Sequence, residues 1–148
     1  MQIAFYKASR GNWVDKGLAI TTLSIYSHCE IVFSDGVAAS ASLRDGGVRF
    51  KRINFGDKWD VYDLYLPASQ EQVARAFFNM HEDAKYDLIG ALGAGLRLDI
   101  GDATKFYCSE ICALVVGEDP DRSPGSLHRK LTRSGKIQQF YGHKDFKL

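Results

Sequence analysis

The sequence predicts an α+β fold in a single domain spanning residues 1–148, with an antiparallel sheet of about five or six strands packed against helices. Short apolar segments separated by turns that contain Gly, Asp and Ser fill the first half of the chain, which indicates strands joined by hairpins. Helical segments follow in the second half, and this order favours α+β over a repeated strand–helix alternation. At 148 residues the chain is long enough to bury a hydrophobic core.

The hydrophobic periodicity predicts the individual elements. Strands are expected over Gln2–Tyr6, Ser27–Phe33, Val37–Ser42, Val48–Ile53, Trp59–Leu66 and Ile137–Tyr141. Helices are expected over Trp13–Ser24, Ser69–Ala84, a shorter segment beginning at Tyr86, Tyr107–Val116 and Ser126–Leu131.

The helix expected from Ser69 has a recognisable start and a candidate buried face. Ser69 followed by Gln72 is typical of an N-terminal capping box. Its expected buried stripe consists of Val73, Ala76, Phe77 and Met80.

Charge and cysteine content exclude several classes of protein. Nineteen basic and eighteen acidic residues give a net charge of +1, which argues against a nucleic-acid-binding protein. The basic stretch Arg122–Lys136 is better explained as a solvated helix and tail. Three cysteines make no disulfide framework. Cys108 and Cys112 lie one helical turn apart, but no second cluster completes a metal site. Metal binding by Cys108, Cys112 and His28 is therefore the least favoured function.

No segment of the sequence predicts secretion or membrane insertion. The first apolar stretch, Ile3–Tyr6, is too short for a signal sequence. The Gly/Ala-rich run Leu88–Leu98 is interrupted by Arg97 and is too short to span a bilayer. We therefore expect a cytoplasmic protein without stable membrane insertion, with delivery by a phage or a secretion system as the alternative. The oligomeric state is not predicted.

Two segments far apart in the chain carry candidate chemistry. Cys108 is expected in the first turn of a helix, where the backbone dipole favours a thiolate and free N–H groups can hold an oxyanion. His28 lies on an expected strand and can supply the base that such a thiol needs. The commoner role of a cysteine is a small buried hydrophobe, and this role is favoured firmly for Cys112.

Strand alternation gives His28 a polar neighbour. His28, Glu30 and Val32 share one face, whereas Cys29, Ile31 and Phe33 share the other, which is expected to face the core. A carboxylate at Glu30 can orient the imidazole and stabilise its charged form, and its alternative role is that of a solvated strand residue. The other histidines, His81, His128 and His143, are interpreted as surface residues.

A third member of the site depends on the register of the next hairpin. If the loop is Ser34–Gly36, Ser42 faces His28 and Ser40 faces Glu30. If the loop is only Asp35-Gly36, both serines move to the opposite face. We favour Glu30 as the orienting residue, with Ser42 and Ser40 in reserve.

Three further side chains are candidates for contact with substrate. Tyr107 and Ser109 flank Cys108, and Tyr26 lies two residues before His28. Aromatic packing is the commoner use of the two tyrosines.

Four motifs in this order resemble the circularly permuted branch of the NlpC-type papain-like superfamily, including YiiX-like proteins and, more distantly, lecithin retinol acyltransferase-like enzymes. In sequence order they are Tyr26-Ser27-His28, Arg44-Asp45-Gly46-Gly47-Val48, Tyr86-Asp87-Leu88-Ile89-Gly90 and Phe106-Tyr107-Cys108-Ser109-Glu110. In the permuted branch the histidine strand precedes the cysteine, as it does here.

The resemblance implies a papain-like fold and a Cys/His mechanism without a metal or other cofactor. Cys108 would attack the carbonyl of a peptide or acyl substrate, and His28 would take and return the proton. Relatives usually carry a polar orienting residue on the next strand, where this chain has only Ser40 and Ser42. Either Glu30 takes this role, or the site is a dyad of Cys108 and His28.

The leading expectation is a cysteine peptidase or amidohydrolase, with a cell-wall peptide as one candidate substrate and an intracellular protein or peptide amide as another. A lipid-directed acyltransferase or esterase is the alternative within the same chemistry, with Ile89–Leu98 as its candidate acyl site. A catalytically inactive binding module is the alternative from a different class.

Overall fold

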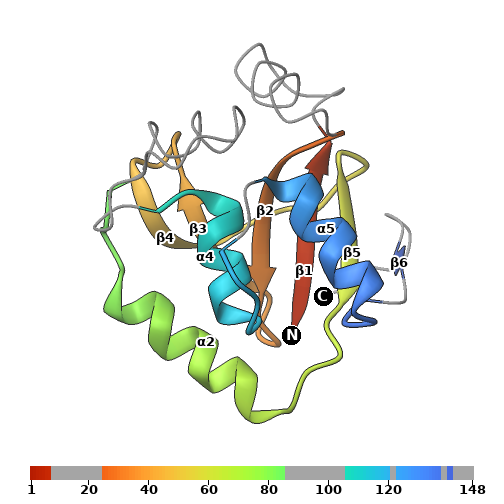
Figure 1. Cartoon of the computed structure of the whole chain (residues 1–148). Helices are drawn as coiled ribbons and strands as arrows, with labels where there is room; N and C mark the ends of the chain where they lie inside the picture. The colour runs from red at the N-terminus through yellow and green to blue at the C-terminus, as the bar shows by residue number, and fades with distance from the viewer. Residues whose placement is uncertain (8–24, 86–105, 121–122, 138–139, 142–148) are drawn as a thin grey trace.

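The structure is a computed structural model, and it describes residues 1–7, 25–85, 106–120, 123–137 and 140–141 (Figure 1). The helices expected over Trp13–Ser24 and from Tyr86 onward lie outside these residues, as do the candidate acyl segment Ile89–Leu98 and His143.

Within the described residues, six strands form one antiparallel sheet in the order β4-β3-β2-β1-β5-β6. The strands are β1 (Gln2–Lys7), β2 (Tyr26–Val32), β3 (Val37–Ser42), β4 (Gly47–Arg52), β5 (Trp59–Asp63) and β6 (Phe140–Tyr141). The N-terminal strand is thus inserted between β2 and β5 near the middle of the sheet. The predicted α+β class and the number of strands are confirmed.

Three described helices accompany the sheet: α2 (Ser69–Met80), α4 (Cys108–Val115) and α5 (Pro124–Arg133). Helix α4 packs on β2 and β3, α5 packs on β2, and the two helices contact each other across one face of the sheet (Figure 1). The main hydrophobic core lies between this face and the helices. Its fully buried large side chains include Ile3, Phe5, Ile31, Phe78, Ile111, Leu127 and Leu131.

The opposite face of the sheet has its own small apolar cluster. Ala4, Val32, Ala38, Phe55 and Val61 form this cluster, and Ile53 and Trp59 pack against it. Phe55 belongs to the connection between β4 and β5. This connection therefore covers part of the opposite face, called the second face below. The face that carries Glu30 is therefore not simply solvated.

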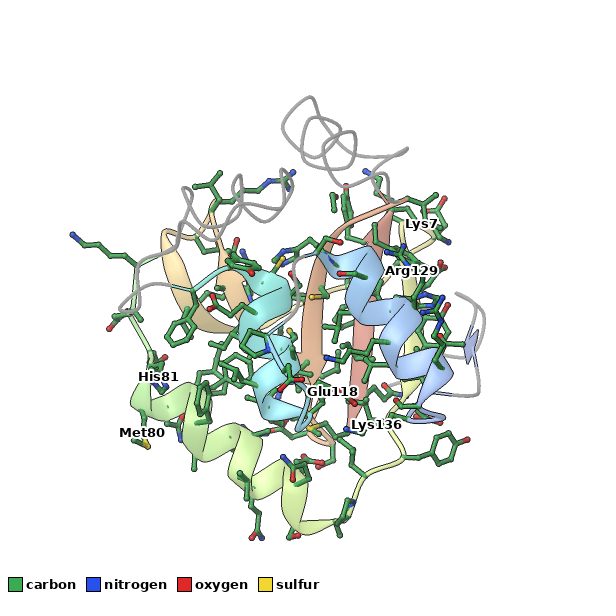
Figure 2. All side chains as sticks on the ribbon, in the orientation of Figure 1. Lys7, Met80, His81, Glu118, Arg129 and Lys136 are labelled. Atoms are coloured by element: carbon green, nitrogen blue, oxygen red, sulfur yellow. The ribbon has the colours of Figure 1, made fainter. Side chains whose placement is uncertain are left out.

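Helix α2 corrects the predicted cap and buried stripe. The chain is already helical at Ala68, which occupies the N-cap with no side-chain hydrogen bond, so Ser69 lies inside the helix and cannot cap it. The buried residues are Ala74 and Phe78, one position away from the predicted stripe. Met80 ends the helix at 81% exposure, at the position labelled in Figure 2. The main contacts of α2 with described elements are those with α4 and β4, so only a narrow stripe of the helix, Ala74 and Phe78, is buried.

An ion pair joins the ends of α4 and α5. Lys136 Nζ lies 2.7 Å from Glu118 Oε1 and also donates to the carbonyl of Val116 at 2.9 Å, as the neighbouring labels in Figure 2 indicate. Burial opposes the charge of Glu118, but Lys136 holds the pKa of that carboxyl below its ordinary value. This pair ties the end of the cysteine-bearing helix to the neighbouring helix.

Within the described part of the chain, no helix combines the length and the apolar character needed to cross a membrane.

Candidate functional site

A β-bulge at Ser27 places His28 at an irregular point of the sheet. Tyr6 pairs with His28 but Lys7 pairs with Tyr26, so Ser27 is an extra residue in β2. Without the bulge, Tyr26 and His28 would share a face. Instead, Tyr26 packs on Phe5 in the main core, with ring centroids 5.2 Å apart, whereas the His28 ring lies 6.2 Å from the ring of Trp59. Bulges of this kind commonly redirect side chains at functional sites.

Glu30 orients His28, as the strand alternation predicts. The Nε2–H of His28 donates to Oε1 of Glu30 at 2.7 Å. Glu30 is only 1% exposed, so the alternative of a solvated strand residue is wrong. Because Nε2 is engaged by Glu30, Nδ1 is the ring nitrogen left to exchange a proton with another group.

Arg49, on β4, holds Glu30 from the other side. Its Nη1 and Nη2 donate to Oε2 and Oε1 of Glu30 at 2.7 and 2.6 Å, a bidentate pair. Although burial opposes the carboxylate, Arg49 and His28 together hold the pKa of Glu30 below its ordinary value. Glu30 therefore stays ionised in a buried position.

A second carboxylate fixes Arg49. Arg49 Nε donates to Asp45 Oδ2 at 2.9 Å, and Lys51 Nζ donates to Asp45 Oδ1 at 2.8 Å. The hydrogen bond from Lys51 is the largest cause that lowers the pKa of Asp45. Asp45 lies in the turn before β4. That turn and β4 therefore together hold Glu30 in position, through Arg49.

Gly47 allows this turn to pack closely against the chain that follows α2. Lys85 forms an isolated bridge with Gly47, and Val48 N–H donates to the Ala84 carbonyl at 2.8 Å. A Cβ at position 47 would lie 2.1 Å from that same oxygen. Only glycine fits this contact without displacement of the backbone.

Cys108 is the first residue of α4, and it is 4% exposed. Tyr107 is the N-cap residue, and its backbone N–H donates to Glu110 Oε2 at 3.4 Å. The predicted position of Cys108 in the first turn of a helix is confirmed.

The electrostatic interaction between Cys108 and His28 moves their pKa values in opposite directions. Although burial disfavours the imidazolium, the Cys108 thiolate and then Glu30 raise the pKa of His28 from 6.5 to about 10. A hydrogen bond from the Cys29 thiol and the charge of His28 hold the pKa of Cys108 well below its ordinary value, against the effect of burial. The pair therefore favours a thiolate and an imidazolium.

The three cysteines meet in the core. All are free thiols, and burial raises the pKa of the Cys29 thiol. The Cys112 thiol lies 3.8 Å from the Cys29 carbonyl and donates to it. Cys29 and Cys112 are thus buried neighbours of Cys108.

The hairpin after β2 has the longer of the two predicted loops. Ile31 pairs with Ala39 and Val32 with Ala38, which is the register of the loop Ser34–Gly36. Even so, Ser40 Oγ donates to the Cys29 carbonyl at 2.7 Å, and Ser42 Oγ accepts from the Asp45 N–H at 3.4 Å. His28 therefore donates to Glu30 rather than to either serine.

The predicted substrate-contacting residues have different surroundings. Tyr26 is buried, and its hydroxyl donates to Asp60 Oδ2 at 2.8 Å. Ser109 is fully buried, whereas Tyr107 is partly exposed. Contact of these three residues with a substrate stays a prediction.

His128 is not a simple surface residue. Its ring is half-buried against the rings of Tyr26 and Tyr62, and its Nε2 lies 3.0 Å from the Tyr62 hydroxyl. Burial lowers the pKa of His128. Aromatic partners on β2 and β5, which are distant in sequence, explain why the local sequence did not reveal this packing.

A pocket of about 370 Å³ lies beside His28 on the second face of the sheet. It is lined by Tyr6, Ser27, His28, Glu30, Ser42, Leu43, Arg44, Asp45, Arg49, Lys51, Arg52, Ile53, Asn54 and Trp59. His28 lines this pocket, whereas Cys108 does not.

Sequence reasoning missed Arg49. The alternation of Arg49 and Lys51 on one face of an expected strand was visible, but their contact with Glu30 and Asp45 depends on how β2, β3 and β4 pair. Among the described residues, no group of three or more His, Cys, Asp or Glu side chains is placed to hold a metal ion.

Comparison of the chain with protein-family models, with curated proteins and with solved structures finds no match.

Proposed function

We propose that this protein is a cysteine-dependent hydrolase that cleaves an amide bond, with Cys108 as the nucleophile and His28 as the base. The observation that supports this most directly is the interacting pair of Cys108 and His28, in which the thiol pKa is lowered and the imidazole pKa is raised. A cysteine with a purely structural role needs neither a lowered thiol pKa nor a neighbouring imidazole with a raised pKa, because a protonated thiol is inert.

In the proposed reaction, the Cys108 thiolate attacks the carbonyl carbon of the amide. The N–H groups in the first turn of α4 stabilise the resulting oxyanion. Nδ1 of the His28 imidazolium then protonates the leaving amine as the C–N bond breaks, which leaves a thioester on Cys108. Water attacks the thioester while His28 accepts its proton, and departure of the Cys108 thiolate releases the carboxylic acid.

Glu30 and Arg49 act as positioning residues in this proposal. The Glu30 carboxylate fixes the ring of His28 through Nε2 and stabilises its positive charge. Arg49 holds Glu30 ionised and in place through two hydrogen bonds. The resemblance to the permuted papain-like proteins implies Cys108 and His28, and we propose that family for the chain. Glu30, on the same strand as His28, takes the orienting role that relatives usually place on the next strand.

The same sequence of steps would apply to an ester, so a thiol esterase or acyltransferase is the alternative within this chemistry. A cytoplasmic setting is part of the proposal, since the three free cysteines suit a reducing compartment.

A binding module without catalysis is the second candidate function. The observation that favours it is the position of Cys108, which is buried and does not line the pocket beside His28. In that case the pocket alone would carry the function.

Acylation by p-nitrophenyl acetate and by the matching p-nitroanilide tests the proposal. We expect an acetyl adduct on the Cys108 peptide by mass spectrometry, its loss in Cys108→Ala, and much slower formation in His28→Ala. The matched control Cys112→Ala should keep the adduct. Acetylation of Cys112 or Cys29 at the same rate as Cys108 would contradict the hydrolase, and reaction of the ester without the anilide would favour the esterase.

A further inference from the structure

Three thiols converge where α4 packs on β2. Cys108 and Cys112 belong to α4 and Cys29 belongs to β2, and the two elements contact each other through the main core (Figure 1). Cys29 interacts electrostatically with both of the other thiols, and Sγ of Cys112 lies 3.8 Å from the Cys29 carbonyl oxygen. The proposed hydrolytic steps use only Cys108, so Cys29 and Cys112 are nucleophilic groups to which those steps give no role.

Cys108 is the thiol of the three that is placed to react with a peroxide. Thiolates, rather than thiols, are oxidised by peroxides. Cys108 begins α4, where the helix dipole favours a negative charge, and it interacts with His28, whose positive charge Glu30 stabilises. Cys108 also keeps 4% exposure, whereas Cys29 and Cys112 are fully buried. An oxidant the size of a water molecule therefore reaches Cys108 before the other two.

The geometry favours Cys29 over Cys112 as the thiol that combines with an oxidised Cys108. Cys108 and Cys112 are four residues apart on one helix, which sets their Cβ atoms about 5–6 Å apart. A disulfide needs Cβ atoms about 3.5–4.5 Å apart, so a bond between these two would distort α4. Cys29 lies on the facing strand and is free of this constraint. A thiol from solution would have to enter the core to compete with it.

We propose that Cys108 and Cys29 form a thiol-modification site, which hydrogen peroxide converts reversibly into a disulfide. In the first step, the Cys108 thiolate attacks one peroxide oxygen, the O–O bond breaks, and the His28 imidazolium protonates the departing hydroxide to water. In the second step, the Cys29 sulfur attacks the sulfur of the resulting sulfenic acid. The S–O bond breaks, and the hydroxide leaves with the Cys29 proton as a second water. The two sulfurs together lose the two electrons that the peroxide gains.

The disulfide has a consequence for Cys108. A sulfenic acid that meets no second thiol is oxidised further to a sulfinic acid, which dithiothreitol does not reduce, whereas a disulfide is returned to two thiols by this reagent. Cys29 therefore protects Cys108 from irreversible oxidation. Formation of the disulfide is independent of hydrolysis, but its effect, a reversible loss of the nucleophile, rests on the proposed function.

Disulfide mapping of the full chain after treatment with hydrogen peroxide tests the site. Free thiols are blocked with N-ethylmaleimide in denaturant before digestion, which prevents exchange between thiols and disulfides. Trypsin combined with a glutamate-specific protease places Cys108 in residues 106–110 and Cys112 in residues 111–118. We expect loss of the free thiols of Cys29 and Cys108, a linked pair of peptides that contains both, and a maleimide-labelled Cys112.

Matched cysteine variants test the role of Cys29. Cys112→Ala should form the same disulfide and, after dithiothreitol, regain acetylation of Cys108 by p-nitrophenyl acetate. In Cys29→Ala, oxygen should accumulate on Cys108, and dithiothreitol should fail to restore acetylation once the sulfinic acid has formed. Thermal unfolding of the reduced proteins establishes that each variant is folded, and the disulfide map of the wild type needs neither variant.

Four results would overturn this site: a disulfide between Cys108 and Cys112, one between Cys29 and Cys112, oxygen on Cys108 of the wild type without a disulfide, or three intact thiols at a peroxide concentration that oxidises free cysteine. Acetylation of the unoxidised wild type is measured separately. Normal acetylation without the disulfide would refute the modification site alone, whereas the disulfide without any acetylation would refute the hydrolase alone.

Discussion

At the scale of single residues, the site depends on how His28 is charged. Its ring lies between two anionic groups, the Glu30 carboxylate at Nε2 and the Cys108 thiolate. Their combined effect exceeds the penalty of burial, so the pKa of His28 rises to about 10. An imidazolium at neutral pH is therefore the resting state that this geometry favours.

The first prediction concerns this charge. In the NMR spectrum, the ring protons of His28 should titrate near pH 10 in the wild type. Glu30→Gln should lower that pKa by about 1–3 units, because the substitution removes an opposite charge in direct contact. A wild-type ring that titrates near 6.5, its ordinary value, would contradict the ion pair.

The second prediction concerns Arg49. Arg49→Met leaves the Glu30 carboxylate buried without its bidentate partner, so the free energy of unfolding in urea should fall by about 3–5 kcal/mol. Arg52→Met on the same strand serves as the control, since Arg52 is exposed and should change stability by less than about 1 kcal/mol.

The double variant Glu30→Gln/Arg49→Met checks the cause of this loss. It should be more stable than Arg49→Met alone, because no unpaired charge remains buried. Additive losses in the two single variants would show that Arg49 and Glu30 do not interact.

The third prediction concerns how the contribution of His28 and Cys108 to stability depends on pH. The raised pKa of His28 gives stability that is present below 6.5 and is lost as pH rises towards 10. The lowered pKa of Cys108 gives stability that is present above 9.0 and is lost as pH falls towards the lowered value. Between 6.5 and 9.0, the pair holds one proton in both the folded and the unfolded state, so the two slopes cancel.

Urea unfolding across pH measures this window. The difference in unfolding free energy between wild type and His28→Ala/Cys108→Ala should be level from pH 6.5 to 9.0 and should decline on both sides. A difference that is constant over the entire pH range would mean that folding leaves both pKa values unchanged.

The polar neighbours of His28 were predictable only in part from the sequence. Alternation along β2 placed Glu30 on the face of His28, because two residues on one strand need no knowledge of pairing. Arg49 lies nineteen positions away from Glu30 in sequence, and its contact requires the register of β2, β3 and β4. A long-range ion pair of this kind is not visible in local periodicity.

At the scale of elements, hairpin strands were easier to predict than helix surfaces. The range of β3 agrees with the prediction because turns mark both of its ends. The stripe of α2 was misplaced because a helix at the margin of the core buries few residues, here Ala74 and Phe78. The bulge at Ser27 depends on pairing with β1 and had no local sequence signal.

The fourth prediction concerns the turn before β4. Gly47→Ala places a Cβ 2.1 Å from the Ala84 carbonyl oxygen, so the backbone must shift, with a loss of about 1–3 kcal/mol or more in stability. Gly117→Ala is the matched control, since its Cβ would meet no atom within 4 Å and only its positive φ opposes the substitution.

Thermal unfolding compares the two variants. Gly47→Ala should have the lower melting temperature, and it should also lower the pKa of His28, because Asp45 and Arg49 flank the displaced turn. Equal melting temperatures would show that the contact between Gly47 and Ala84 is not tight.

At the scale of the whole molecule, the sheet separates the thiol from the ligand space. Cys108 lies on the side covered by α4 and α5, and the pocket lies on the opposite side, with the second apolar cluster beside it. His28, next to the bulge, contacts both the thiol and the pocket.

The central claim is that His28 keeps Cys108 ionised, and site-resolved alkylation tests it most directly. Limiting iodoacetamide is applied across pH to the wild type and to His28→Ala, with mass spectrometry of each cysteine. Because Cys108 is 4% exposed, its absolute rate is a weaker indicator than the pH at half-maximal rate. We expect that midpoint well below the ordinary thiol pKa of about 8.5 in the wild type, and near or above it in His28→Ala. A wild-type midpoint for Cys108 no lower than those of Cys29 and Cys112, or one unchanged by His28→Ala, would contradict the account.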